Sequence, residues 1–185
     1  MILAALLAAC TAAPLEPEDT RTFYEAARTW QRYWGYHEPP EETRRHVLTA
    51  KAACEAICPD QARELFMLYV SCVGEESDAR WIKHGKTGWG TIALEPGEVC
   101  AAAKHLGRVA KTPTQRAALW ARFRSDRTFH VWVNIRYLHS RVAESEGDWM
   151  TAMERHNGEK LYSAKILQRW YRTWLEPAPV WMVIR

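Results

Sequence analysis

The sequence of 185 residues lacks an apolar run long enough to cross a membrane as a helix. It also lacks a strong charge of either sign, because 25 Lys and Arg stand against 22 Asp and Glu and leave a net charge of +3. The charges are interleaved along the chain, so nothing in them calls for nucleic acid as a partner. What the chain has is an ordinary apolar fraction of 48% and ten Trp. These values predict one folded domain, or one domain with an extension.

The closely paired cysteines of common zinc-binding motifs are lacking as well. When Cys10 is set apart, four cysteines remain: Cys54, Cys58, Cys72 and Cys100. An even number favours an oxidising compartment and two disulfides, for which three pairings are possible. Cys54 and Cys58 share one helix face, so each is expected to bond to another segment. A zinc site and four buried free thiols are the alternatives, and we expect neither a metal nor a cofactor.

The first ten residues are apolar and rich in alanine. Leu7-Ala8-Ala9-Cys10 is similar to a bacterial lipobox, in which Cys10 would carry a lipid and become the mature N-terminus. No Lys or Arg precedes the apolar segment, so a disordered or docked apolar N-terminus is the alternative. The signal predicts a protein exported to the cell envelope, such as a periplasmic lipoprotein attached to the membrane through Cys10. A phage virion or lysis protein is the alternative setting.

Apolar residues at helical spacing predict a mainly α fold. The expected helices cover about 20–34, 41–57, 60–76, 96–106, 113–124, 125–143, 149–155 and 162–174. In the second of them, the residues expected to face the core are Val47, Leu48, Ala52 and Ile57. The helix over 125–143 is apolar enough to be central and buried.

The chain is organised around residues 65–97. At about 100° per residue, the apolar side chains from Leu65 to Val73 fall on one broad face, and Glu76 falls in the middle of it, about 20° from Leu65. Glu75 falls at the edge of that face. A carboxyl group on an apolar face loses hydration, and its pKa rises. Glycosidic bond cleavage needs such a protonated carboxylic acid as its general acid, so Glu76 is the candidate. The alternative is that both glutamates end a helix in solvent.

Four segments resemble, in order, the motifs of soluble lytic transglycosylases. These segments are Glu76-Ser77 with Gly88-Trp89-Gly90-Thr91-Ile92-Ala93-Leu94, then Asn134-Ile135-Arg136, then Gly147-Asp148-Trp149 with Ala152 and Asn157-Gly158, and finally Tyr162-Ser163-Ala164-Lys165-Ile166-Leu167. The resemblance spans about residues 60–172. It implies a lysozyme-like catalytic domain, related to goose-type lysozymes, over 59–176. An N-terminal segment and tether (1–19) and a helical extension (20–58) would precede that domain, and a tail (177–185) would follow it.

The resemblance also implies an enzyme that cleaves the MurNAc–GlcNAc bonds of peptidoglycan glycan strands. Glu76 would protonate the glycosidic oxygen and then take the proton of the muramic acid 6-hydroxyl, which closes a 1,6-anhydro ring. This route needs no metal and no second carboxylate, and the sequence nominates no second carboxylate. The substrate-binding residues that the resemblance implies are Ser77, Gly88, Trp89, Gly90, Thr91, Asn134, His156, Asn157 and Tyr162. The chain is expected to act as a monomer, without nucleic acid.

The chain departs from the family at three places. Thr91 stands where the family has Gln, His156 stands where it has Tyr, and the Gly-Ala after Asn134-Ile135-Arg136 is lacking. These departures favour one alternative, a catalytically silent glycan-binding or structural protein of an envelope or a virion. A lysozyme-type muramidase that uses water and another carboxylate is the second alternative. Plainer interpretations also stay open: a tight turn that packs Trp89, a solvated His84, a core amide at Asn134, and a helix end at His156-Asn157.

Overall fold

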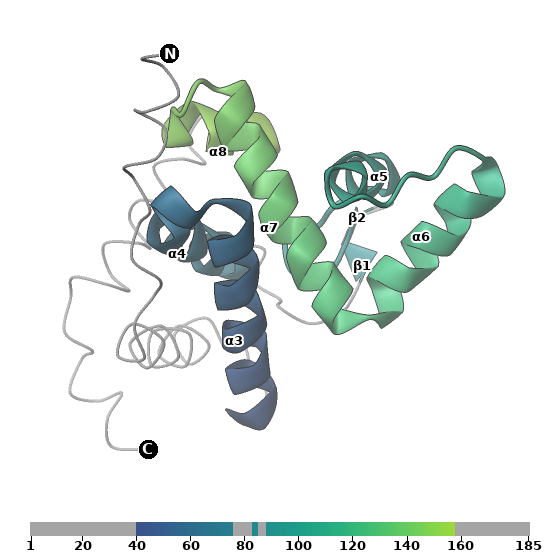
Figure 1. The fold of residues 1–185 in the computed structure, drawn as a ribbon, viewed down its shortest axis with the longest axis horizontal. Helices are drawn as coiled ribbons and strands as arrows, with labels where there is room; N and C mark the ends of the chain where they lie inside the picture. The colour runs from purple at the N-terminus through teal and green to yellow at the C-terminus, as the bar shows by residue number, and fades with distance from the viewer. Residues whose placement is uncertain (1–39, 76–82, 85–87, 158–185) are drawn as a thin grey trace, which may run out of the picture.

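The computed structural model describes residues 40–75, 83–84 and 88–157 of the chain (Figure 1). They form α3 (Pro40–Ile57), the 3₁₀ turn η1 (Pro59–Gln61), α4 (Ala62–Glu75), β1 (Lys83–His84), β2 (Gly88–Trp89), α5 (Pro96–His105), α6 (Pro113–Ser125), α7 (Arg127–Glu144) and α8 (Trp149–Asn157). The predicted mainly α fold is confirmed. None of the described helices is long and apolar enough to cross a membrane.

Several predictions concern residues outside this description. They are the helices over 20–34 and 162–174, the lipidated Cys10, and the site residues Glu76, Ser77 and Tyr162.

The central element is α7. It packs against α3, α4, α5, α6 and α8, and in Figure 1 it crosses the molecule with α3 and α4 on one side and α5 on the other. A helix covered on several sides must be apolar on several sides. Phe129, Val131, Ile135 and Leu138 are accordingly buried. The sequence-based prediction of a central buried helix is therefore confirmed.

The broad apolar face predicted for residues 65–73 is present in α4. Leu65, Phe66 and Tyr69 are at most 1% exposed, whereas Arg63 and Glu64 are exposed. The helix follows η1, whose first residue is Pro59, as the sequence indicates. α4 ends at Glu75, and its residues from Leu65 to Val73 contribute to the core.

α3 covers nearly its predicted length, and Val47 is buried as predicted, but the rest of its buried stripe differs from the prediction. The buried stripe consists of Val47, Ala50, Ala53 and Cys54. Leu48 is 46% exposed and Ala52 is also exposed, so their prediction as core residues is wrong. Ile57 does pack against the core. Small side chains let α3 lie close to α7 and α4, and in an alanine-rich helix spacing alone does not decide which stripe is covered.

The four cysteines Cys54, Cys58, Cys72 and Cys100 are free thiols. The prediction of two disulfides is therefore wrong. The alternative of four buried free thiols holds in part, because Cys54 and Cys72 are buried and Cys58 and Cys100 are only partly buried. Burial raises the pKa of the Cys54 and Cys58 thiols, which keeps them protonated. The sulfur of Cys72 lies 3.4 Å from that of Met153 and packs α8 onto α4. Within the described ranges, no group of three or more His, Cys, Asp or Glu is placed to hold a metal ion.

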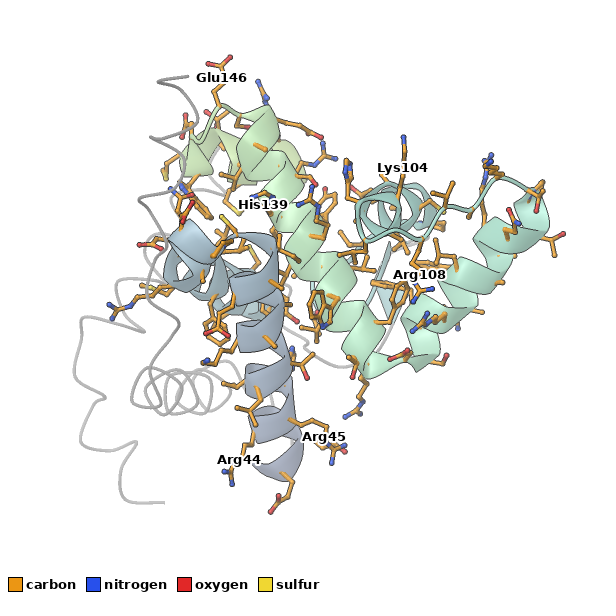
Figure 2. The ribbon with its side chains drawn as sticks, viewed as in Figure 1. Arg44, Arg45, Lys104, Arg108, His139 and Glu146 are labelled. Atoms are coloured by element: carbon orange, nitrogen blue, oxygen red, sulfur yellow. The ribbon has the colours of Figure 1, made fainter. Side chains whose placement is uncertain are left out.

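A Schellman motif ends α7, with a residue other than glycine in the left-handed conformation. Gly147 N–H donates to Val142 O at 3.0 Å and Glu146 N–H donates to Ala143 O at 3.1 Å. Glu146 has a φ of 53° and projects from the turn between α7 and α8 (Figure 2). The same motif ends α5 at Gly107, as the sequence predicts, with a φ of 73°.

Glu146→Gly is therefore expected to stabilise the protein by about 0.5–1 kcal/mol. The left-handed conformation costs a residue with a Cβ about 1–2 kcal/mol, and glycine avoids this cost. Glycine also has greater conformational freedom in the unfolded chain, which offsets part of the stabilisation. Urea denaturation measures the change. Ala143→Gly, in the last turn of the same helix, is the control and should destabilise by about 1 kcal/mol. A loss of stability in Glu146→Gly would contradict the prediction.

Candidate functional site

The Gly-Trp-Gly segment forms a short hairpin followed by a tight turn. β1 pairs antiparallel with β2, so that Lys83 lies opposite Trp89 and His84 opposite Gly88. Residues 83–84, for which the sequence suggests no strand, form one because their backbone groups pair with those of β2. The chain then turns at Gly90, whose φ is 85°. This positive φ is the conformation for which glycine is suited.

The turn is seated on the ring of His130, a residue of α7. A Cβ added at Gly90 would overlap Cε1 of His130 and lie 2.5 Å from its Nε2. His130 is fully buried. Its ring stacks on that of Phe123, with the ring centroids 4.2 Å apart. Residue 90 must therefore lack a side chain for the turn to lie this close to α7.

Thr91 is the centre of a buried hydrogen-bond network. Its N–H donates to His130 Nε2 at 3.2 Å, and its hydroxyl oxygen lies 3.1 Å from the same nitrogen. Asn134 Nδ2 donates to that hydroxyl at 2.6 Å. The Tyr69 hydroxyl of α4 lies 3.4 Å from Thr91 Oγ1 and 2.7 Å from His46 Nε2 of α3. The network therefore joins α3, α4, the turn after β2 and α7.

The contacts of His130 define its protonation. Nδ1 lies 3.1 Å from the carbonyl oxygen of Phe123, which can only accept, so Nδ1 carries the hydrogen. Nε2 is then the acceptor for Thr91. Burial lowers the pKa of His130 to about 3, although the Phe123 carbonyl favours the charged ring. At neutral pH, His130 is a neutral side chain that holds the turn in place.

Asn134 lies one helical turn after His130 and is fully buried. Its amide nitrogen holds Thr91, which is what the core-amide interpretation expects. Its Oδ1 is buried and accepts no hydrogen bond from the described residues. A buried acceptor of this kind needs a donor, such as water or a polar ligand atom.

His156, near the end of α8, belongs to a second polar cluster. Its Nδ1 lies 3.2 Å from the hydroxyl of Tyr137, and burial lowers the pKa of His156 to about 4, against the effect of the Glu98 carboxylate. The Tyr137 hydroxyl donates to Glu98 at 2.7 Å and accepts from Arg141 Nε at 3.0 Å. Burial, together with Glu98, raises the pKa of Tyr137. A pocket of about 220 Å³ beside this cluster is lined by Glu98, Tyr137 and Arg141.

The structure thus brings three predicted site residues, Gly90, Thr91 and Asn134, together around His130. His156 lies in the second cluster, and no hydrogen bond within the described part of the chain joins it to Thr91. Gly88 and Trp89 form β2, and Asn157 ends α8. Sequence reasoning missed His130. Its position four residues before Asn134 places it on the same helix face, and that spacing is the signal that could have found it.

No protein-family model, curated protein or solved structure matches the chain.

Proposed function

We propose that this protein cleaves the MurNAc–GlcNAc bonds of peptidoglycan as a lytic transglycosylase, with Glu76 as general acid and then general base. The observation that supports the proposal is the meeting of three motif-bearing segments at Thr91. Tyr69 of α4 and Asn134 of α7 both contact the hydroxyl of Thr91. The helix that precedes Glu76, the Gly-Trp-Gly turn and the Asn-Ile-Arg helix are therefore tied together.

The packing of α4 suits the acid chemistry. Cys72 and Val73, in its last two turns, are buried, and Glu76 is the residue that follows the described part of the helix. An apolar setting favours the protonated form of a carboxyl group. In the proposed reaction, Glu76 gives its proton to the glycosidic oxygen. It then removes the proton of the muramic acid 6-hydroxyl, which attacks the anomeric carbon and closes the anhydro ring. No water is consumed.

Thr91 supports the turn in this proposal. It is fully buried, its hydroxyl accepts a hydrogen bond from Asn134, and its N–H donates to His130. The task of bonding the sugar's acetamido group then falls to the backbone of the turn. The proposal also puts the protein in the cell envelope, where peptidoglycan lies, with Cys10 as its lipid attachment.

We expect Glu76→Gln to lower the release of anhydro-ended muropeptides by at least about 10²-fold, because glutamine keeps the shape of the side chain but has no proton to donate. Mass spectrometry of fragments released from purified peptidoglycan measures this. Glu75→Gln removes the adjacent carboxylate and is the matched control, expected to stay within a few-fold of wild type. Circular dichroism checks that both variants fold.

Other products would lead to other conclusions. Reducing-end fragments in place of anhydro ends would identify a hydrolase, which needs a second carboxylate about 5–9.5 Å from the first. Anhydro fragments released by Glu76→Gln at the wild-type rate would remove Glu76 from the mechanism. If a folded wild type released nothing from several wall types and at several pH values, a silent glycan-binding protein would replace the enzyme.

A further inference from the structure

The segment that runs from α5 to α6 carries charge of one sign only. Positive and negative residues are interleaved over most of the chain, but between residues 99 and 125 there are six Lys and Arg and no Asp or Glu. The whole chain has a net charge of only +3, so the rest of it is acidic on balance. Positive charge concentrated on one part of a protein attracts an anionic partner.

Four of these cations are exposed. They are Lys104 near the end of α5, Arg108 and Lys111 in the loop that follows, and Arg116 in α6. None of the four forms an ion pair or a side-chain hydrogen bond within the residues that the structure describes. Positive charge without an acidic partner in the described residues therefore surrounds the loop between α5 and α6.

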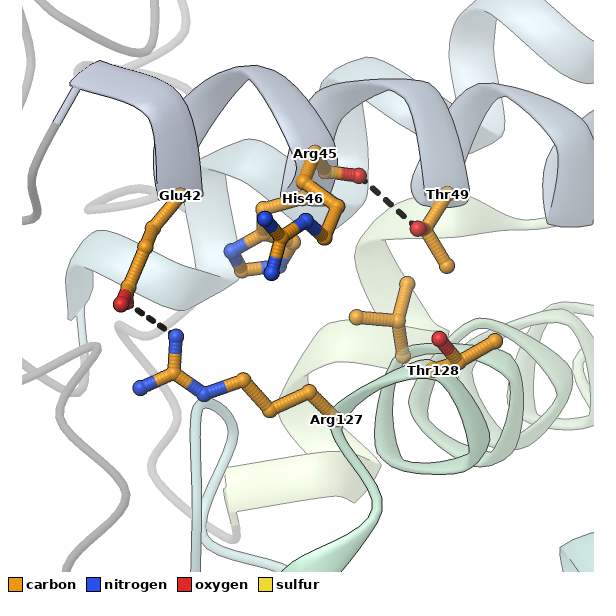
Figure 3. A pocket seen from close by; sticks show the side chains of 7 residues that line it. Glu42, Arg45, His46, Thr49, Arg127 and Thr128 are labelled. Carbon is orange, nitrogen blue, oxygen red and sulfur yellow. Dashed lines mark hydrogen bonds and ion pairs between the residues drawn. The ribbon is translucent and has the colours of Figure 1, made fainter.

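Two arginines near the start of α7 are different, because acidic residues compensate their charge. Arg127 forms an ion pair with Glu42 across the cleft between α3 and α7 (Figure 3). Arg122, in the last turn of α6, pairs with Asp126 at 3.1 Å. These two arginines therefore contribute little net charge to the surface.

The loop between α5 and α6 (residues 106–112) is held by hydrogen bonds at both ends. Arg108 N–H donates to Ala103 O at 2.9 Å, in the Schellman motif that ends α5. Lys111 N–H donates to Oε1 of Gln115 at 2.8 Å, beside the capping box that begins α6. The two cations therefore project from fixed backbone positions, and little backbone entropy is lost when a partner binds.

Between these two cations the loop exposes an apolar side chain. Val109 is 55% exposed, more than any other large apolar side chain in the described part of the chain. In Figure 1 the loop lies on the side of the molecule opposite to α3 and α4. An exposed apolar residue flanked by cations suits the interface of a lipid bilayer, where acyl chains begin just below the headgroup phosphates.

We propose that this loop rests on the surface of an anionic lipid bilayer, with Arg108 and Lys111 at headgroup phosphates and Val109 at the boundary of the acyl chains. Basic residues near a membrane surface attract anionic lipids, and Lys104 and Arg116 add to this attraction from the flanking helices. Nucleic acid or an anionic wall polymer compensates cations too, but neither offers an apolar layer to Val109. The surface shares no residue with the proposed peptidoglycan cleavage and does not depend on it.

Sedimentation of the full chain with lipid vesicles tests the proposal. Cys10→Ser is made in every sample, which removes the proposed lipid attachment and leaves the same N-terminus throughout. We expect vesicles that contain phosphatidylglycerol to bind the protein at least about 10²-fold more strongly than phosphatidylcholine vesicles, because the four cations act together. Raised salt should weaken the binding. Equal binding to both kinds of vesicle would overturn the proposal.

Two double variants with the same charge change compare the loop with the rest of the surface. Arg108→Gln with Lys111→Gln should lower partitioning onto anionic vesicles by about 25-fold, since each basic residue at the surface contributes about fivefold. Arg44→Gln with Arg63→Gln removes two exposed cations from α3 and α4 and should change it less than about twofold. Figure 2 shows Arg44 near the start of α3, away from Arg108. An equal loss in both double variants, or a loss in neither, would contradict the proposal.

Val109→Ser distinguishes a bilayer from a soluble polyanion, because it leaves the charge unchanged. We expect it to lower partitioning onto anionic vesicles about threefold, through the loss of a partly inserted apolar side chain. Full partitioning of Val109→Ser would refute the contact with the acyl boundary and with it the bilayer as partner. Binding of the wild-type loop to duplex DNA, with none to vesicles, would do the same.

Discussion

Gly90→Ala is expected to destabilise the protein by about 3–5 kcal/mol, enough to unfold a domain of ordinary stability. Two costs add at this position. The φ of 85° is unfavourable for any residue with a Cβ, and the added Cβ would overlap the ring of His130. The ring cannot move aside easily, because it stacks on Phe123 and its Nδ1 donates to the Phe123 carbonyl.

Two other glycines separate these costs. Gly107 has a φ of 73° with nothing within 4 Å of an added Cβ, so Gly107→Ala should cost only the backbone strain of about 1–2 kcal/mol. Gly97 lies in α5 with open space and no positive φ, and Gly97→Ala should stabilise by about 0.5–1 kcal/mol. Urea denaturation of the three variants measures the differences. If Gly90→Ala were no worse than Gly107→Ala, the close seating of the turn on His130 would be refuted.

Stability is expected to fall by about 4 kcal/mol between pH 7 and about pH 5, because two buried histidines stay neutral in the folded protein. The pKa values of His130 and His156 are lowered from 6.5 to about 3 and about 4. Below pH 6.5 the two histidines bind protons in the unfolded chain but stay neutral in the folded protein. The contribution of the two neutral histidines to the free energy of unfolding is thus complete above pH 6.5. It is lost as the pH falls from 6.5 toward their pKa values in the folded protein. By linkage, each histidine accounts for about 2 kcal/mol at pH 5.

Chemical denaturation at a series of pH values measures this loss. His156→Gln should halve it, leaving about 2 kcal/mol from His130. The pKa of Asp126 is lowered mainly by its hydrogen bond from the Phe129 N–H, and its contribution is lost only at more acidic pH, near the ordinary range of a carboxyl group. A wild-type free energy of unfolding that stayed constant from pH 7 to pH 5 would show that the two histidines take up protons in the folded protein as readily as in the unfolded chain, which would contradict the lowered pKa values.

Apolar spacing predicted the helices well where the covered face is wide. In α4 and α7 the large side chains mark the buried positions without ambiguity, so Leu65, Tyr69 and Ile135 were found from spacing. In α3 the covered stripe combines Val47 and Cys54 with two alanines, Ala50 and Ala53, and the larger Leu48 is exposed. Hydrophobicity ranks Leu48 above its alanine neighbours. Which of these residues is buried depends on how closely α7 and α4 approach α3. The spacing of apolar residues in the sequence does not reveal that approach.

The candidate site was predictable in part for the same reason. Gly90 and Asn134 were named because the segments that contain them resemble a known family, and each is also an exception to its local pattern, as a glycine in a turn and as an amide in an apolar helix. His130 on an apolar helix is an equally strong exception, but its partner Thr91 is 39 residues away in sequence. The cysteines are a case in which counting residues in the sequence gave the wrong prediction. Their even number suggested disulfides, whereas pairing depends on distances that counting does not contain.

The seating of Gly90 on His130 has a consequence for how related chains could exchange parts. The turn and the central helix fit each other through contacts that span 39 and 43 residues, from Thr91 to His130 and to Asn134. A recombination event between Thr91 and His130 would join a Gly90 turn that fits the His130 ring to a central helix with a different side chain at position 130. The two segments are therefore expected to be inherited as a block, together with Phe123 of the intervening α6, which stacks on His130. The other residues of α6, most of which are exposed, can vary more freely.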